Sequence, residues 1–181
     1  MQFKEKEIVL KNGKTAVLRS PASADAKKML DFLIASAGES DYTLCYPEER
    51  NIGEKTEAQI LESVLSSPYD MMICCFIDGK LTAAAQISLF RTRKTAHRAT
   101  LSLAVLKDFW GLGIGTALMA EMEAVAKTRC ITQLELSYME GNARARTLYE
   151  KTGFSAVAEK PCAYRLQNGC MKSEIFMIKA L

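Results

Sequence analysis

The chain has 181 residues, of which 49% are hydrophobic and 25% are charged. These values are typical of a globular protein, and we expect a single domain over residues 1–181. The formal net charge of +3 is too small to indicate a nucleic-acid partner. No apolar run approaches the roughly 20 residues that span a bilayer, and the charged start does not resemble a signal peptide. We therefore expect no membrane partner and a cytoplasmic location.

Six cysteines are present but form no C-x-x-C pair, and the chain has a single histidine, His97. Because a structural zinc site needs about four ligands at close spacing, we expect no metal. Most of the cysteines lie in apolar or strand-like segments. They are therefore predicted to be free, buried thiols in a reducing compartment.

The first half of the chain predicts antiparallel hairpins and two helices. Asn12-Gly13 and Asp78-Gly79 each separate strand-like runs, which is a strong hairpin signal. Ser23 is predicted to cap a helix over residues 24–37 that Gly38 ends, and Thr56 to cap a second helix that reaches Leu65. The expected strands cover residues 7–10, 15–19, 71–77, 81–90 and 97–106.

The second half alternates strands with helices. Helices are predicted over residues 113–128 and 142–151, and strands over residues 133–138, 154–159 and 174–180, with a polar stretch at 160–172. A helical crossover joins parallel strands, whereas hairpins join antiparallel ones. The sequence therefore predicts an α/β (α+β) fold with one mixed, mostly antiparallel central sheet flanked by helices.

The most informative segment is Trp110-Gly111-Leu112-Gly113-Ile114-Gly115-Thr116, between a predicted strand and a predicted helix. Its glycines let the main chain approach a ligand, and the first helical turn offers unpaired N–H groups to a pyrophosphate. No lysine follows Gly115, which excludes a P-loop. A dinucleotide-binding turn would need glycine at Thr116, although Glu135 follows at about the right distance. A dinucleotide-dependent oxidoreductase therefore stays an alternative.

Three segments together resemble the GNAT superfamily of N-acetyltransferases: Leu103-Ala104-Val105, the glycine-rich segment, and residues 142–154, NARARTLYEKTGF. Gly113 and Gly115 match the family's acetyl-CoA signature Gln/Arg-x-x-Gly-x-Gly/Ala, while Trp110 replaces the Gln/Arg. The resemblance implies the acyl-CoA N-acyltransferase fold. It also implies an acetyl-CoA-dependent N-acetyltransferase of the EC 2.3.1 class, which transfers acetyl to a primary amine by direct attack on the thioester. The acceptor would be a small molecule or a peptide N-terminus.

The resemblance also implies roles for matching residues. The strand segment Leu103, Ala104 and Val105 would splay from its neighbour and hold the pantetheine arm and the acetyl carbonyl. The pyrophosphate would bind to Gly111, Leu112, Gly113, Ile114, Gly115 and Thr116. Asn142 would contact the cofactor, and Tyr149 would be the general acid for the leaving thiolate. A phenol with a pKa of about 10 keeps its proton at neutral pH, as this acid role requires.

The general base is not indicated by the sequence. Ser137 and Thr100 stand where subgroups of the family carry a glutamate, so Glu135 and Glu39 are the candidates, and ordered water is an option. Without a base, the chain could be a non-catalytic acyl-CoA-binding module of the same fold. The acceptor and the oligomeric state, including a homodimer, stay open.

Overall fold

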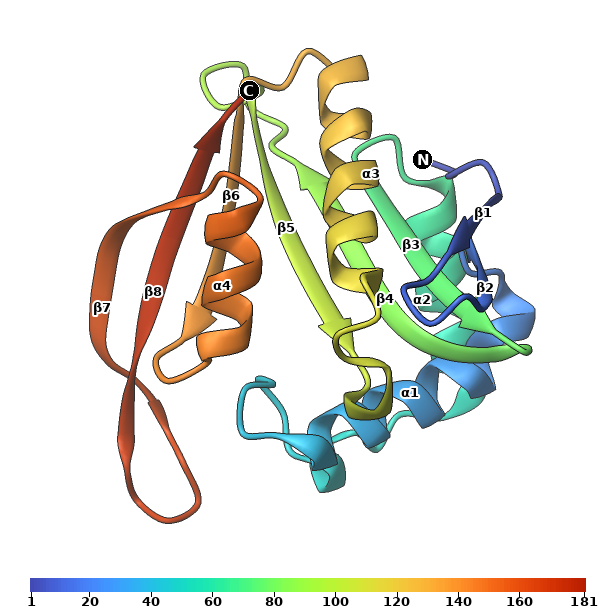
Figure 1. The fold of residues 1–181 in the computed structure, drawn as a ribbon, viewed down its shortest axis with the longest axis horizontal. Helices are drawn as coiled ribbons and strands as arrows, with labels where there is room; N and C mark the ends of the chain where they lie inside the picture. Colours follow the sequence, from blue (N-terminus) through green and yellow to red (C-terminus); the bar gives the residue numbers. More distant parts are fainter. The chain divides into compact units, whose positions relative to one another are not determined.

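The computed structural model describes residues 1–181 (Figure 1). Its eight strands form a sheet in the order β1-β2-β3-β4-β5-β6-β8-β7. The β5–β6 pair is parallel, and the β1–β2, β2–β3, β3–β4, β6–β8 and β7–β8 pairs are antiparallel. The predicted mixed, mostly antiparallel sheet flanked by helices is confirmed. The chain divides into two compact units, residues 1–88 with 102–118 and residues 89–101 with 119–181.

The first unit begins with the predicted hairpin around Asn12-Gly13. The Leu10 N–H donates to the Lys14 carbonyl at 2.8 Å, and Gly13 has a φ of +80°, a conformation that glycine adopts without strain. The strands and helices of this part of the chain are β1 (Lys6–Val9), β2 (Thr15–Arg19), α1 (Ala26–Glu39), α2 (Glu54–Ser66), β3 (Asp70–Ile77) and β4 (Lys80–Leu89).

The core of the first unit lies between the two helices and the sheet. Side chains from α1, α2, β3 and β4 form one buried cluster, which also includes a residue that follows β5 (Arg98–Val105). Each helix presents its apolar face to this cluster and its charged face to water, as expected for amphipathic helices. The cluster consists of Ala26, Met29, Phe32, Leu61, Cys74, Phe76, Leu81 and Leu106.

Two predicted helix boundaries are wrong. Gly38 does not end α1, which continues to Glu39; its φ is not left-handed, and a β-carbon there would lie 3.6 Å from Pro47 Cγ. A side chain here would make only ordinary van der Waals contact with the Pro47 ring, so the helix does not depend on glycine at this position. The second helix starts at Glu54 with Gly53 as its N-cap, two residues before Thr56.

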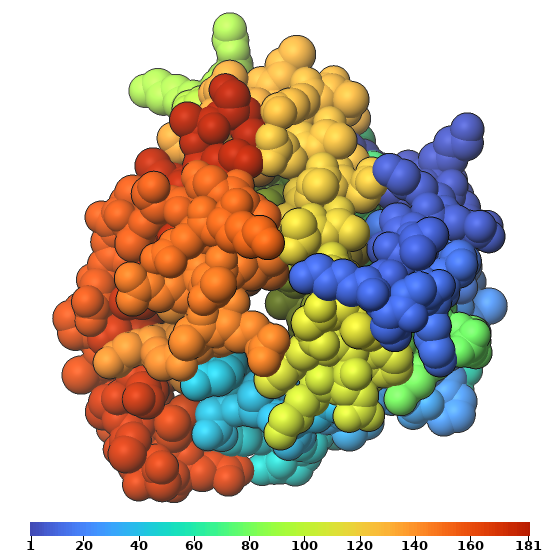
Figure 2. Space-filling model, viewed as in Figure 1, coloured from blue at the N-terminus to red at the C-terminus, as the bar shows by residue number.

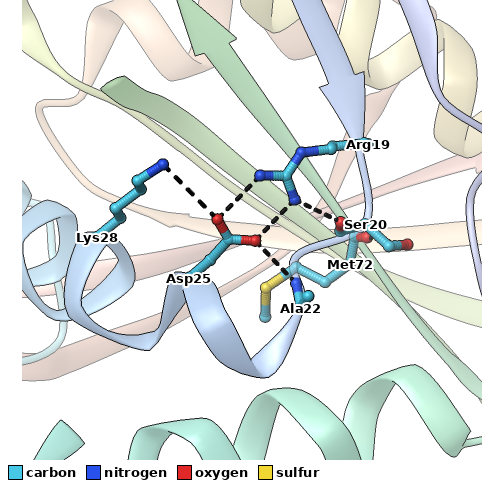
Figure 3. A network of polar contacts seen from close by, with 6 residues as sticks. All are labelled: Arg19, Ser20, Ala22, Asp25, Lys28 and Met72. Atoms are coloured by element: carbon cyan, nitrogen blue, oxygen red, sulfur yellow. Dashed lines mark hydrogen bonds and ion pairs between the residues drawn. The ribbon is translucent and has the colours of Figure 1, made fainter. Parts of the chain in front are cut away.

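The start of α1 differs from the prediction as well. Residues Ser23–Asp25 form a 3-10 turn, and no side-chain cap is made by Ser23. Instead, the Asp25 carboxylate accepts a hydrogen bond from the Ala22 N–H at 2.9 Å and two from Arg19 at 2.7 and 2.9 Å (Figure 3). The guanidinium carbon of Arg19 lies 3.8 Å from the centroid of the Phe76 ring. One ion pair therefore ties β2 to the first turn of the helix.

The second unit contains the parallel part of the sheet. β5 and β6 (Gln133–Met139) pair in parallel through Arg98–Gln133, Ala99–Leu134 and Thr100–Glu135. The helix α3 (Ile114–Thr128) lies between these strands in the chain, as the predicted crossover requires. α4 (Ala143–Lys151) follows β6 and leads to the hairpin of β7 (Ser155–Arg165) and β8 (Met171–Ala180).

The final hairpin is longer than predicted. The polar stretch 160–172 is mostly strand, because β7 reaches Arg165 and β8 begins at Met171. β7 is the last strand of the sheet, and its residues 155–162 are all exposed. The alternation of polar and apolar residues that reveals a half-buried strand is therefore missing. The β7–β8 register also shifts twice, between Ala156 and Ala158 and between Lys160 and Tyr164.

A charged network joins three elements of the second unit. The Lys179 ammonium on β8 donates to Glu123 on α3 and, at 2.7 Å, to the Thr152 carbonyl at the end of α4. Glu123 also pairs with Lys127 at 2.8 Å, and the two lysines lower the pKa of its carboxyl. A β-carbon on Gly153 would come within 3.3 Å of Lys179 Cε, so this lysine lies against the glycine that ends α4.

The six cysteines are free, but only part of the prediction for them is confirmed. Cys74 and Cys75 are buried, whereas Cys130, Cys162 and Cys170 are exposed. No group of three or more His, Cys, Asp or Glu side chains is placed to hold a metal ion. None of the helices combines the length and the hydropathy that crossing a bilayer requires.

Candidate functional site

The glycine-rich segment forms the predicted turn between β5 and α3. A short 3-10 turn, Lys107–Phe109, follows the strand. Gly111 and Gly113 then adopt φ values of +79° and +92°, which side chains rarely allow. The Trp110 indole N–H donates to the Val105 carbonyl at 2.7 Å. Trp110, which departs from the family signature, thus fastens the turn to the end of β5.

The main-chain N–H groups of residues 111–116 have no hydrogen-bond acceptor within the protein. The first intrahelical bond of this region is donated by Ala117 to the Gly113 carbonyl at 3.0 Å. Unpaired N–H groups at the start of a 15-residue helix carry partial positive charge and favour an anion. A β-carbon at Gly111 would meet nothing within 4 Å, so the space beside this main chain is open. The segment fits a diphosphate.

The end of β5 lies beside a carboxylate of the first unit. Leu103, Ala104 and Val105 are half-buried, and the Leu106 N–H donates to the Thr82 carbonyl on β4 at 2.9 Å. One residue further, the Lys107 N–H donates to a carboxylate oxygen of Glu39 at 2.6 Å. The helix α1 therefore places Glu39, one of the two base candidates, next to the end of the strand segment.

The second unit holds the other motif residues on α4. Asn142 is the N-cap, and its side-chain oxygen accepts from the Ala145 N–H at 3.0 Å. Tyr149 is 7% exposed and packs between Tyr138 and Phe154, each with a ring-centroid distance of 6.2 Å. Burial raises the pKa of Tyr149 to about 12, and its hydroxyl makes no hydrogen bond within the protein. The phenol therefore keeps a proton that it can donate.

Glu135, the other base candidate, is engaged in an ion pair. Its carboxylate accepts from both the Arg98 Nε and, at 2.7 Å, the Arg98 Nη2, and also from Gln133 at 2.8 Å. The hydrogen bonds from Arg98 lower the pKa of Glu135. A general base works best with a pKa near the working pH, so this shift weakens Glu135 as a proton acceptor.

A carboxylate that the sequence did not indicate lies beside Ser137. The Ser137 hydroxyl on β6 donates to a carboxylate oxygen of Glu174 on β8 at 2.6 Å. Burial, together with Glu174, raises the pKa of Tyr164 to about 12. The two strands are far apart in the sequence, so only their pairing could have revealed this contact.

The structure places the sequence-predicted residues in two groups. Leu103–Val105, residues 111–116 and Glu39 belong to the first unit, and Asn142, Tyr149 and Glu135 to the second. The Trp110–Val105 bond and the Glu39–Lys107 bond were missed. The first could have been suspected from the single tryptophan that replaces a polar signature residue. The second has no local signal, since 68 positions separate its partners.

The fold resembles that of several solved acetyltransferase structures. A GNAT-family acetyltransferase from Streptococcus pneumoniae is 22% identical, with a TM-score of 0.85 over 92% of this chain and 99% of that one. A ribosomal-protein-alanine N-acetyltransferase from Brucella melitensis is also 22% identical, with a TM-score of 0.77 over 91% and 99% of the two chains. A third structure is that of yncA, a putative acetyltransferase from Salmonella typhimurium solved with acetyl-CoA. It is 17% identical, with a TM-score of 0.78 over 92% of this chain and 94% of that one.

At these identities the similarity establishes the fold alone. No curated protein matches the chain. The sequence pattern of the Acetyltransferase (GNAT) family, however, matches residues 36–154, which is more than half of the chain and includes both the glycine-rich turn and the α4 motif. The chain therefore belongs to the GNAT family of acetyltransferases.

Proposed function

We propose that this protein is an N-acetyltransferase that transfers the acetyl group of acetyl-CoA to a primary amine of a small molecule or a peptide N-terminus. The observation that carries the proposal is the run of unpaired main-chain N–H groups at residues 111–116. Such a run suits the diphosphate of coenzyme A. Free thiols throughout the chain are consistent with a reaction in the reducing cytoplasm.

The residues divide the chemistry among them. Acetyl-CoA supplies the acetyl group and a thiolate leaving group. The amides of residues 111–116 bind the diphosphate, and the main chain of Leu103–Val105 aligns the thioester. When the amine nitrogen forms its bond to the acetyl carbon, the carbon–sulfur bond breaks. The Tyr149 hydroxyl, which stays protonated because burial raises its pKa to about 12, donates the proton that the departing sulfur takes up.

The general base takes up the proton that the amine nitrogen loses when it is acetylated, and for this base we favour Glu39 over Glu135. Glu39 lies at the Lys107 N–H, two residues after Val105, whereas Glu135 is held by Arg98. We expect Glu39→Gln to lower kcat by about 10²-fold. Glu135→Gln is the matched comparison and should keep a kcat near that of the parent. If only Glu135→Gln lowers kcat, the assignment is reversed.

The proposed function is tested by binding and by turnover. Isothermal titration with acetyl-CoA and, separately, with NAD shows which nucleotide the turn accepts; acetyl-CoA should bind and NAD should not. Thiol release is then measured on polyamines, amino acids, aminoglycosides and peptide N-termini. Binding of acetyl-CoA without thiol release on any amine would support a non-catalytic acyl-CoA-binding module instead, and binding of NAD alone an oxidoreductase.

A further inference from the structure

The turn of the N-terminal hairpin lies directly against the glycine-rich segment. The Lys11 N–H donates to the Leu112 carbonyl at 3.1 Å. A β-carbon built on Gly113 would lie 3.7 Å from Lys11 Cγ and 3.8 Å from Lys11 Cε. The aliphatic part of the Lys11 side chain therefore runs across the main chain at Gly113. In the space-filling view, the N-terminal residues (blue) cover the edge of this segment (yellow) (Figure 2).

The charge of Lys11 is not neutralised by the protein. Its side chain is exposed, and its ammonium has no carboxylate partner. Lys14 in the same turn differs, since its ammonium lies 3.8 Å from Asp78. Lysine packs its methylene groups on a surface and keeps its ammonium in water. Lys11 thus places a positive charge that has no counter-ion beside main-chain N–H groups that have no hydrogen-bond acceptor.

We propose that Lys11 is a cofactor-binding residue whose ammonium contacts the diphosphate of coenzyme A while the amides of residues 111–116 hold it. This inference rests on the proposed function. Lys11 lies outside residues 36–154, which match the family pattern. The hairpin becomes a second element of the diphosphate site, fixed there by the Lys11–Leu112 main-chain bond.

The expected strength of the contact between Lys11 and the diphosphate follows from its exposure to solvent. An ammonium–phosphate contact is charge-assisted, but an exposed one is weakened by water and salt. We expect its removal to raise the Kd for coenzyme A by about tenfold at low salt, with a smaller effect at high salt. The main-chain bond from Lys11 is kept in any side-chain variant, so the hairpin should stay in place.

The test compares Lys11→Met with Lys14→Met by isothermal titration. Methionine keeps the packing across Gly113 and removes the charge. Lys11→Met should bind coenzyme A about tenfold more weakly than the parent and lose less affinity when salt is added, while Lys14→Met should match the parent. Unchanged melting temperatures would show that both variants fold.

Dephospho-coenzyme A, which lacks the 3′-phosphate, identifies the group that is contacted. The loss in Lys11→Met should persist with this ligand, because the diphosphate is still present. A loss that appears only with coenzyme A would overturn the proposal by moving the contact to the 3′-phosphate. Parent-like affinity and salt dependence in Lys11→Met would also overturn it, whereas a parent protein that binds no coenzyme A would instead refute the proposed function.

Discussion

At the scale of single residues, Tyr149 shows how packing keeps a side chain protonated. Rings of Tyr138 and Phe154 surround it, and the resulting burial raises its pKa to about 12 while its hydroxyl keeps no partner within the protein. Burial of this kind is ordinary for a tyrosine with a structural role. It also keeps the hydroxyl protonated at neutral pH, as a general acid requires.

For Tyr149→Phe we expect kcat to fall by about 10²-fold with an unchanged Kd for acetyl-CoA. The phenyl ring preserves the packing, and only the proton donor is lost. In the parent protein, the raised pKa also means that kcat should not decline between pH 9 and about pH 11 through ionisation of Tyr149. Steady-state kinetics over this range checks both statements, and a variant as fast as the parent would remove Tyr149 from the acid role.

Asp25 is the residue on which acid stability is expected to depend. Hydrogen bonds from Arg19 lower its pKa below the ordinary value of 3.8 (Figure 3). A lowered folded-state pKa stabilises the protein above pH 3.8 and loses this effect as the pH falls through the folded-state value.

We therefore expect Asp25→Asn to lower the free energy of unfolding by about 2 kcal/mol at pH 7, because a charged hydrogen-bonded pair is broken. The difference from the parent should shrink below pH 3.8. Asp31→Asn is the control, since Asp31 pairs with Lys27 only at the surface and should change stability little. Urea unfolding at several pH values measures both; equal losses in the two variants would contradict the prediction.

At the scale of elements, Lys179 connects β8, α3 and the end of α4. Its side chain is 18% exposed and meets one carboxylate and one carbonyl. Lys179→Met would leave the Thr152 carbonyl without its partner and Glu123 with Lys127 alone. We expect a loss of about 2 kcal/mol in the free energy of unfolding.

The surface member of the same network provides the comparison. Lys127→Met removes an exposed i,i+4 pair with Glu123 and should cost about 0.5 kcal/mol. Chemical denaturation of the two variants side by side measures the difference. If Lys127→Met proves as destabilising as Lys179→Met, the Thr152 contact contributes nothing to stability.

At the scale of the whole molecule, binding of the substrate should be visible in thermal stability. A ligand present at 100 times its Kd adds about 2.7 kcal/mol to the free energy of unfolding. For a chain of this size, that corresponds to a rise of about 5–10 °C in melting temperature. Thermal unfolding with acetyl-CoA, and with NAD as the control, measures the shift, and an equal response to both would argue against coenzyme A specificity.

Local patterns were enough to predict most of the fold. Turn pairs such as Asn12-Gly13 and the 3.6-residue period of α3 carry their own signal, and the glycine spacing at residues 111–116 predicts an anion site. Contacts between distant segments carry no such signal. Lys11 and Leu112 meet only where two turns of the fold come together, and Ser137 and Glu174 meet only because β6 pairs with β8. The full length of β7 could not be predicted either, because an exposed edge strand lacks the alternation of polar and apolar residues.

The irregular outer strand has a consequence for solubility. A straight sheet border with free N–H and C=O groups invites another chain to add to it and start aggregation. The hydrogen-bond ladder that an added strand would need is interrupted in β7. The interruptions are two register shifts, Pro161, and Cys162 with its left-handed φ of +52°. Replacing the irregular residues of β7 by apolar residues that favour a regular strand would lengthen the hydrogen-bond ladder. The edge of the sheet would then become a template for fibrils.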